Sequence, residues 1–278
     1  MVHEGVRGAP PGIMEIYGLD STGKTSLALS VGREAALRGL PVMFINMEHD
    51  ADPAFVRRVI GDCVYSSPPC GEAAVETAYA GIRSGVRVVV IDTVDAMIPL
   101  TECNLPVGER AFLAHRRLVY HGFTVLNELA HSKDALVVVT SQVRENPKER
   151  YPSPKASFHR ELHHKAGSII QLHKKSTLGE YGVVKYYKIR ARLEKYRNSA
   201  PNDEEYIYLW SGAGFDRNYE LLLKLMHDGR LTRRGSYWAH GGVSIGPGYE
   251  EATKAIARNN DSYAKLAGVT NETDSNNG

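Results

Sequence analysis

The stretch from Gly12 to Leu29 constrains the fold of this chain more than any other part of the sequence. Its central residues, GLDSTGKT, fit the pattern G-x4-G-K-[ST]. The residues before them, Ile13–Tyr17, read as a strand, and apolar residues at helical spacing follow the pattern. A strand, a glycine loop and a helix in this order are typical of a phosphate-binding loop. The alternative, an ordinary glycine-rich turn with a surface lysine, leaves both flanking elements unexplained.

Each residue type in this loop has a chemical reason. The two glycines allow a tight turn, so that consecutive N–H groups point inward and a helix N-terminus adds its positive dipole end. Lys24 would then reach the β- and γ-phosphates of a nucleotide, and the Thr25 hydroxyl would bind Mg²⁺. The predicted nucleotide-binding cradle consists of Gly18, Leu19, Asp20, Ser21, Thr22, Gly23, Lys24, Thr25 and Ser26.

Acidic residues follow two further predicted strands. The apolar run Val42–Met47 ends on Glu48, and the run Val86–Ile91 ends on Asp92. The carboxyl ends of parallel strands meet at the ligand edge of an open α/β sheet. Glu48 is therefore the candidate catalytic base for an attacking water molecule, and Asp92 is the candidate second contact to Mg²⁺, made through water.

The order of the predicted elements indicates an α/β fold. Strands and helices alternate as far as Thr140, which predicts right-handed crossovers and a mostly parallel central sheet. Three later strand candidates, Ser168–His173, Val183–Arg192 and Glu205–Trp210, follow one another without helices and predict an antiparallel extension. We expect a core at residues 1–232, a small α+β C-terminal module at 233–268 and a disordered tail at 269–278.

Basic residues concentrate in one part of a chain whose net charge is only +2. Between Arg144 and Arg197 there are 14 Lys and Arg but 5 Asp and Glu, which predicts a polyanion-binding surface, with a solvated basic face as the alternative. The part up to Lys165 has three prolines, aromatic side chains and no clear periodicity, which favours a nucleic-acid-binding loop. Its candidate DNA contacts are Arg144, Lys148, Arg150, Lys155, Phe158, Arg160 and Lys165.

Three cysteines and the absence of long apolar runs indicate the compartment. Cys63, Cys70 and Cys103 are odd in number and lack C-x-x-C spacing, so we expect neither a disulfide framework nor a zinc site. No apolar run approaches the ~18 residues of a membrane span, and the first residues lack the core of a signal peptide. We therefore expect an intracellular, cytoplasmic protein that does not enter a membrane.

Six groups of residues carry a further pattern along nearly the whole chain, from about Gly12 to Leu266. They read MEIYGLDSTGKT, FINMEHDADP, VVVIDTVDAMIP, TSQVR, SAP followed by GAGF, and GSYW followed by SIGPG. Each group is weak evidence by itself, but in this order they resemble the RecA family of DNA strand-exchange recombinases. The resemblance implies a RecA-type phosphate-loop ATPase core that uses ATP and Mg²⁺ and binds single-stranded DNA.

The resemblance also implies roles for residues at the predicted nucleotide site. Glu48 corresponds to the glutamate that activates the attacking water, and Asp92 corresponds to the magnesium aspartate. Gln142 corresponds to the glutamine that senses the γ-phosphate and relays its presence to the adjacent DNA-binding loop, here Arg144 to Lys165. The other DNA-binding loop of the family would lie from Pro99 to about Ala114.

Two more pairs of residues are assigned only by the resemblance. Asp52 and Phe55 correspond to the positions that contact and stack on adenine, with Phe in place of the more usual Tyr. Lys195 and Arg197 correspond to a basic pair that reaches into the ATP site of the neighbouring subunit. ATP would then lie between two subunits of a head-to-tail homo-oligomer or filament.

These features predict a recombinase that binds single-stranded DNA, and also duplex DNA, in homologous recombination and DNA repair, with ATP hydrolysis switching its DNA affinity. Because 12 residues precede Ile13, we expect the family's N-terminal polymerisation segment to be absent. A filament-incompetent accessory ATPase that modulates another recombinase is therefore a second hypothesis. A ring-forming helicase-type motor is a third, and a DNA-binding protein for which ATP is only a conformational ligand is a fourth.

Overall fold

The chain divides into two compact units, Met1–Tyr206 and Ile207–Gly278. The computed structural model describes residues 9–103, 105–106, 113–144, 155–180, 183–196, 203–210, 214–240, 243–259 and 262–263. Helix α8 (Arg217–His227) packs against helix α9 (Gly248–Arg258), so α8 belongs to the smaller of these units. The boundary expected at residue 232 stays a prediction. The expected tail, 269–278, lies outside the described residues.

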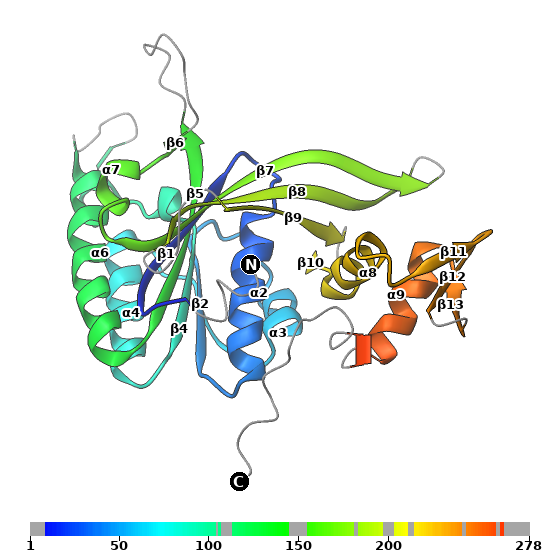
Figure 1. Ribbon diagram of the computed structural model, residues 1–278. Helices are drawn as coiled ribbons and strands as arrows, with labels where there is room; N and C mark the ends of the chain where they lie inside the picture. Colours follow the sequence, from blue (N-terminus) through cyan, green and yellow to red (C-terminus); the bar gives the residue numbers. More distant parts are fainter. Residues whose placement is uncertain are drawn as a thin grey trace. The chain divides into compact units, whose positions relative to one another are not determined.

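The larger unit is built on a mostly parallel sheet, as the sequence predicts (Figure 1). Its order is β9-β8-β7-β1-β5-β4-β2-β3, and the pairs among β1, β2, β3, β4, β5 and β7 are parallel. Strand β8 pairs with β7 in the antiparallel direction and so begins the predicted extension. The strands are β1 (Gly12–Gly18), β2 (Val42–Asn46), β3 (Val64–Ser66), β4 (Val88–Asp92), β5 (Leu136–Arg144), β7 (Ala166–Glu180), β8 (Val183–Tyr196) and β9 (Asp203–Trp210).

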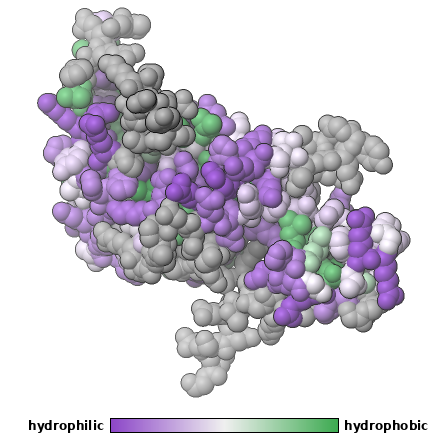
Figure 2. Space-filling model, turned by 45° about the horizontal axis from the view of Figure 1, so that its top comes forward, coloured by the Kyte–Doolittle hydropathy of each residue, from purple (hydrophilic) through white to green (hydrophobic). Residues whose placement is uncertain are grey.

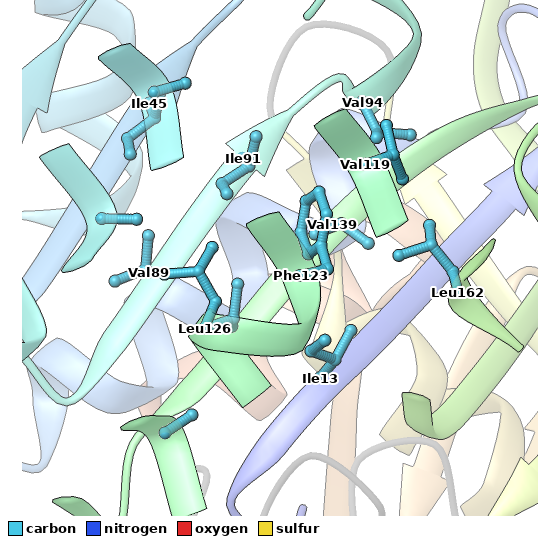
Figure 3. Packing of buried hydrophobic residues seen from close by; sticks show 14 of the residues in the cluster. Ile13, Ile45, Val89, Ile91, Val94, Val119, Phe123, Leu126, Val139 and Leu162 are labelled. Atoms are coloured by element: carbon cyan, nitrogen blue, oxygen red, sulfur yellow. The ribbon is translucent and has the colours of Figure 1, made fainter. Parts of the chain in front are cut away.

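Helices cover both faces of this sheet. Helices α2 (Lys24–Leu37) and α3 (Pro53–Ile60) pack against each other, and α4 (Gly71–Arg83) packs against α6 (Ala114–Lys133) as a second pair. The α4–α6 side holds a large apolar cluster, in which Phe123 and Leu126 of α6 meet Val89, Ile91 and Val139 from the sheet (Figure 3). The β4 and β5 strands are buried on both faces, which explains their continuous β-branched sequences.

The register of the strands brings their carboxyl ends to one edge. Gly18 at the end of β1 lies opposite Gln142 of β5, and Asn46 at the end of β2 lies opposite Asp92 at the end of β4. The residues that follow these strand ends therefore lie close together, although they are far apart in the sequence. This edge is where the sequence predicts the nucleotide.

The segment predicted as an irregular loop, Arg144 to Lys165, contains regular structure in its second half. Strand β6 (Lys155–Ala156) pairs with the end of β5, and helix α7 (His159–Leu162) follows it. Apolar side chains of this half, including Leu162, belong to the core cluster, which holds the backbone in place. Residues 145–154 lie outside the described residues.

Other elements differ from expectation in their length. Strands β7 and β8 form a long antiparallel ribbon, and β7 continues seven residues beyond the predicted end at His173. Helix α6 begins at Ala114, after Leu113 at φ 64°. The region predicted as a loop after Pro99 contains the short helix α5 (Leu100–Cys103), which follows the 3-10 turn η1 (Val94–Ala96).

The smaller unit has an aromatic core. Tyr219 of α8, Tyr249 of α9 and Trp238 lie in a chain of ring contacts with centroid separations of 6.0 and 5.9 Å. Asp216 begins α8 by accepting hydrogen bonds from the N–H groups of Asn218 and Tyr219. The strands of the smaller unit are β10 (Gly214–Phe215), which pairs with Leu209 and Trp210 of the part of β9 that belongs to this unit, and the antiparallel group β11 (Thr232–Arg234), β12 (Tyr237–His240) and β13 (Val243–Pro247). Strands β12 and β13 pair as an antiparallel hairpin.

The surface of the larger unit is mainly polar on one face. On the face shown in Figure 2, most of the coloured residues of this unit are hydrophilic. A search of the described helices found none that is both long and apolar enough to cross a membrane.

Candidate functional site

The phosphate loop leaves the N-terminus of α2 open to a ligand. Gly23 caps this helix with φ 87°, and among the described residues no side chain bonds to the cap and no acidic residue lies in the first turn. The Thr22 hydroxyl donates to the carbonyl oxygen of Leu19 at 2.7 Å, which holds the turn closed. The unpaired N–H groups and the helix dipole therefore favour an anion here.

Gly18 and Lys24 shape this loop further. A Cβ atom on Gly18 would lie 2.6 Å from the Leu172 carbonyl oxygen of β7, so only glycine fits without a shift of the backbone. The Lys24 ammonium folds back over the loop, with Nζ 3.1 Å from the carbonyl oxygens of both Gly18 and Leu19. A cation and free helix N–H groups thus point to the same place, which fits the charge of nucleotide phosphates.

Asp92 is a buried carboxylate at the end of β4, with 3% of its surface exposed. Burial raises its pKa, while hydrogen bonds from the Thr140 and Thr25 hydroxyls oppose that change. Thr140 is itself held by its neighbour, because the Thr93 hydroxyl donates to the Thr140 carbonyl oxygen at 2.7 Å. The oxygen atoms of Thr25 and Asp92 beside Lys24 form a donor set that suits Mg²⁺, a hard cation that prefers oxygen ligands.

Glu48 lies at the same edge, two residues after β2. The N–H of Met47 donates to the Asp92 carbonyl oxygen at 2.7 Å, which ties the Glu48 segment to β4. Burial raises the pKa of Glu48, and the negative charges of Asp92 and Asp50 raise it further. A carboxylate whose pKa is raised accepts a proton more readily, which is what a general base requires.

A second set of hydrogen bonds fixes the turn after Glu48. Asn46 donates through Nδ2 to the Ala51 carbonyl oxygen at 3.1 Å and to the Tyr65 hydroxyl oxygen at 2.9 Å. Tyr65 in turn donates to the same Ala51 carbonyl at 2.9 Å. The turn is therefore anchored to β2 and β3.

The two residues predicted to contact adenine lie at the beginning of α3. Asp52 is the N-cap of this helix, and its Oδ1 accepts a hydrogen bond from the Ala54 N–H at 3.1 Å. Phe55 is half-buried, and the Arg58 guanidinium lies 5.4 Å from the centre of its ring. The structure therefore shows a capping role for Asp52 and a partly covered ring at Phe55.

Gln142 lies in β5 opposite Gly18 and is anchored through its backbone. Its N–H donates to Oδ2 of Asp95 at 2.7 Å. Its carbonyl oxygen accepts from the backbone N–H and the hydroxyl of Ser157, both at 2.9 Å. The predicted γ-phosphate sensor is therefore joined directly to the segment that follows residues 145–154. The sequence analysis missed Asp95, Thr140 and Ser157, and only the T-S-Q order beside the predicted sensor marks Thr140 as a candidate.

The predicted DNA contacts have different surroundings. Phe158 is 4% exposed, and its ring packs on His115 with a centroid separation of 4.6 Å, so it is a core residue and not the exposed stacking residue expected from the sequence. Arg160 is exposed, and Lys165 Nζ lies 3.5 Å from the centre of the Tyr120 ring. Arg144 and Lys155 pair through their backbones, whereas Lys148 and Arg150 lie outside the described residues.

The basic pair predicted to act between subunits is described only in part. Lys195 lies at the end of β8, and its Nζ donates to the His163 carbonyl oxygen of the same chain at 2.5 Å. Arg197 lies outside the described residues. The structure thus shows Lys195 in a contact within its own chain that the sequence did not predict.

The β7–β8 ribbon supplies basic side chains that the sequence analysis counted but did not place. Lys174 lies 4.0 Å from the centre of the Tyr187 ring, and Lys188 lies 4.1 Å from that of Tyr206. Arg190 and Arg192 lie on the same face of β8 as Lys188, whereas Lys174, which pairs with Ile189, lies on the opposite face. Arg190 Nη1 and Arg192 Nε lie 3.5 and 3.8 Å from the Glu204 Oε1 atom. Burial, Lys175 and Arg190 together lower the pKa of His173 in the same ribbon. Cations interleaved with aromatic rings are typical of a nucleic-acid-binding surface.

The fold and the site together define a phosphate-loop protein of the α/β class, with the ligand edge formed by β1, β4, β5 and the turn after β2. The family model of the RecA N-terminal domain matches residues 2–216, and the chain belongs to this family. Protein RecA of Aquifex pyrophilus is 30% identical over 258 residues, which cover 91% of this chain and 74% of the relative. Protein RecA of Aquifex aeolicus is also 30% identical, with 91% and 75% covered. Protein RecA of Thermus thermophilus is 29% identical over 267 residues, with 91% and 76% covered.

Proposed function

We propose that this protein is an ATP- and Mg²⁺-dependent, single-stranded-DNA-binding recombinase of RecA type, in which ATP hydrolysis switches the affinity for DNA. The observation that supports it best is the meeting of Lys24, Asp92, Glu48 and Gln142 at one edge of a single sheet. Membership of the RecA family supports the same function. The proposal includes head-to-tail assembly, in which Lys195 and Arg197 face the nucleotide of a neighbouring subunit.

Each residue at this edge has a separate role in ATP hydrolysis. Lys24 and the N-terminus of α2 bind the phosphates, and Thr25 and Asp92 would hold Mg²⁺, which supplies positive charge to the phosphate oxygens when it is bound. Glu48 accepts the proton of a water molecule whose oxygen forms a bond to the γ-phosphorus. The bond from that phosphorus to the bridging oxygen breaks, and ADP leaves with the electron pair.

Gln142 provides the route from the nucleotide to DNA. It lies opposite Gly18 of the phosphate loop, and its carbonyl oxygen accepts a hydrogen bond from the Ser157 hydroxyl, in the middle of the basic segment Arg144 to Lys165. A shift of Gln142 toward or away from the γ-phosphate would therefore move the residues on both sides of positions 145–154. The positive side chains of the β7–β8 ribbon add a second surface for DNA phosphates.

The test is ATP hydrolysis with Mg²⁺, with and without single-stranded DNA, by the unaltered chain and the Lys24→Ala variant. We expect DNA to stimulate hydrolysis in the unaltered chain, and Lys24→Ala to lower the rate by about 1,000-fold, because it removes a cation from the phosphate site. Lys133→Ala, at the exposed end of α6, is the matched control and should leave the rate unchanged. Undiminished turnover by Lys24→Ala would contradict the proposal.

A further inference from the structure

Glu15 is a fully buried carboxyl group in the middle of the parallel sheet, three residues before the phosphate loop. It lies in β1 with 0% of its surface exposed, between Val139 of β5 and Ile169 of β7 in the strand register. Its Oε1 accepts a hydrogen bond from the Ser141 hydroxyl at 2.7 Å. Its Oε2 has no hydrogen-bond partner within the described part of the chain. A buried polar atom without a partner is costly, so its retention needs an explanation.

Ser141 connects Glu15 to the predicted phosphate sensor, because Gln142 is the next residue. The Ser141 side chain is held by Glu15, while the Gln142 N–H is held by Asp95 at 2.7 Å. Two carboxyl groups thus fix two consecutive residues of β5, one through a side chain and the other through the backbone. Together they set the position of Gln142 relative to Gly18, its register partner in the phosphate loop.

The groups around Glu15 disfavour its negative charge. Burial raises the pKa of Glu15 to about 7, the Ser141 hydrogen bond lowers it, and the charges of Asp95 in η1 and Glu194 in β8 raise it again. Burial raises the pKa of Tyr17, on the same strand, and a hydrogen bond with Glu194 raises it further. Arg192 lowers the pKa of this tyrosine. Both charged groups that act on Glu15 directly are therefore acidic.

Helix α6 also packs against β1, and its polar side chains lie near Gly12, at the beginning of that strand. A Cβ atom on Gly12 would lie within 3.0 Å of His131 and Asn127, three residues before Glu15. These side chains contact the beginning of β1, and the Asn127 Oδ1 is buried. The neutral, protonated carboxyl is the form that suits this environment, since it accepts the Ser141 bond without burying a charge.

We propose that Glu15 is a positioning residue for the proposed hydrolysis: in its neutral form it holds Ser141, and through it Gln142, in place beside the phosphate loop. Ionisation would place a charge beside Asp95 and Glu194 and would shift the end of β5. Communication between nucleotide and DNA would then depend on one proton inside the sheet. This inference rests on the proposed function, but its structural part is testable without ATP.

The first experiment compares DNA-stimulated ATP hydrolysis by the unaltered chain and by Glu15→Gln between pH 6 and pH 8. Glutamine stays neutral throughout, whereas Glu15 is mostly neutral at pH 6 and only about one tenth neutral at pH 8. The ratio of the Glu15→Gln rate to the unaltered rate should therefore rise roughly tenfold over this range. Taking the ratio removes the pH dependence of Glu48, which both chains share. Glu76→Gln, on the exposed side of α4, is the control and should give a constant ratio.

Ser141→Ala tests whether Glu15 acts through Ser141. This variant should have a lower DNA-stimulated rate at every pH, and adding Glu15→Gln to it should change neither the rate nor its pH profile. Independent effects of the two substitutions would overturn the inference. So would a Glu15→Gln rate that follows the unaltered rate across the whole pH range.

Hydrogen exchange at the Gln142 amide gives a measurement without nucleotide or DNA. After correction for intrinsic exchange, protection of this amide in the unaltered chain should fall roughly tenfold from pH 6 to pH 8, and protection in Glu15→Gln should stay constant. Equal behaviour of the two chains would overturn the inference. A chain that does not hydrolyse ATP at all contradicts the proposed function, while the exchange result still decides the role of Glu15.

Discussion

The carboxyl edge of the parallel strands and the β7–β8 ribbon both bring charged side chains together, but they do so in opposite ways. The Asp92 carboxyl group at this edge and the Glu15 carboxyl group inside the sheet behind it are buried, and each accepts a hydrogen bond from a specific hydroxyl group, that of Thr140 or Ser141. On the ribbon, Lys174 and Lys188 are not buried, and each lies over an aromatic ring about 4 Å away.

The difference follows from the surrounding medium. A charge or polar group that has lost its water must be satisfied by a particular neighbour, so its position is fixed within a few tenths of an ångström. A cation at the surface keeps its water, and its interaction with a polyanion depends on the number of charges more than on their exact placing. Single substitutions at the edge should therefore have large effects on stability that differ from residue to residue. Single substitutions on the ribbon should have small and similar effects on DNA binding.

The largest effect on stability is expected from Gly18→Ala. The new methyl group would lie 2.6 Å from the Leu172 carbonyl oxygen and 2.7 Å from the Thr22 hydroxyl, and the carbonyl belongs to a neighbouring strand. We expect the free energy of unfolding to fall by about 3 kcal/mol, measured by chemical denaturation, because the backbone of β1 or β7 must move.

Gly39→Ala is the matched control for this substitution. Gly39 has φ +73°, but a Cβ atom there would meet nothing within 4 Å, so only the backbone strain of about 1 kcal/mol remains. Equal losses from the two variants would show that packing at the edge is looser than the structure indicates, and would weaken the contrast with the ribbon.

The pH dependence of the unfolding free energy tests whether Glu15 is neutral in the folded chain. Because the pKa of Glu15 is raised from 4.5 to about 7 in the folded chain, folding takes up a proton between these values. The stabilisation from this uptake is complete below about pH 4.5 and is lost as the pH rises through 7. The difference in unfolding free energy between Glu15→Gln and the unaltered chain should therefore move in favour of the variant by about 2 kcal/mol from pH 5 to pH 8.

Denaturant titrations at several pH values measure this difference, and Glu76→Gln again serves as the exposed control. A difference that stays constant with pH would mean that Glu15 is ionised, or that its charge is satisfied by its surroundings. Either result would mean that Glu15 behaves like the surface charges of the ribbon, and that burial does not distinguish the two regions.

The sequence predicted the parts of the fold in which local pattern and final position coincide. The glycine loop between a strand and a helix, the acid at the end of β4 and the alternation of elements all predicted the parallel sheet that the structure shows. The edge was predictable because parallel strands must bring their carboxyl ends together. Glu48 and Asp92 are therefore predictable as site candidates from their positions after two apolar strands.

The remaining parts depend on partners that are distant in the sequence. The sequence places Glu15 inside the predicted strand Ile13–Tyr17 but does not show its role, since its partner Ser141 lies 126 positions away. Phe158 was assigned to DNA because basic residues surround it in sequence, yet in space it packs on His115. The length of β7 was underestimated because its exposed end, which includes Lys174 and Lys175, has the polar composition of a loop.

The smallest effects are expected from single substitutions on one face of the ribbon, where Lys188→Gln, Arg190→Gln and Arg192→Gln should each weaken binding to single-stranded DNA by less than about 1 kcal/mol. Each cation that contacts a phosphate releases counterions, so each loss should reduce the slope of log K against log salt by about 0.7. The triple variant should lower the slope by about 2, whichever residue is replaced first, while Lys133→Gln should leave it unchanged. Fluorescence anisotropy at several salt concentrations measures both quantities. A single variant that abolished binding would show that the ribbon, like the edge, has one required geometry, and an unchanged slope in the triple variant would place the DNA elsewhere.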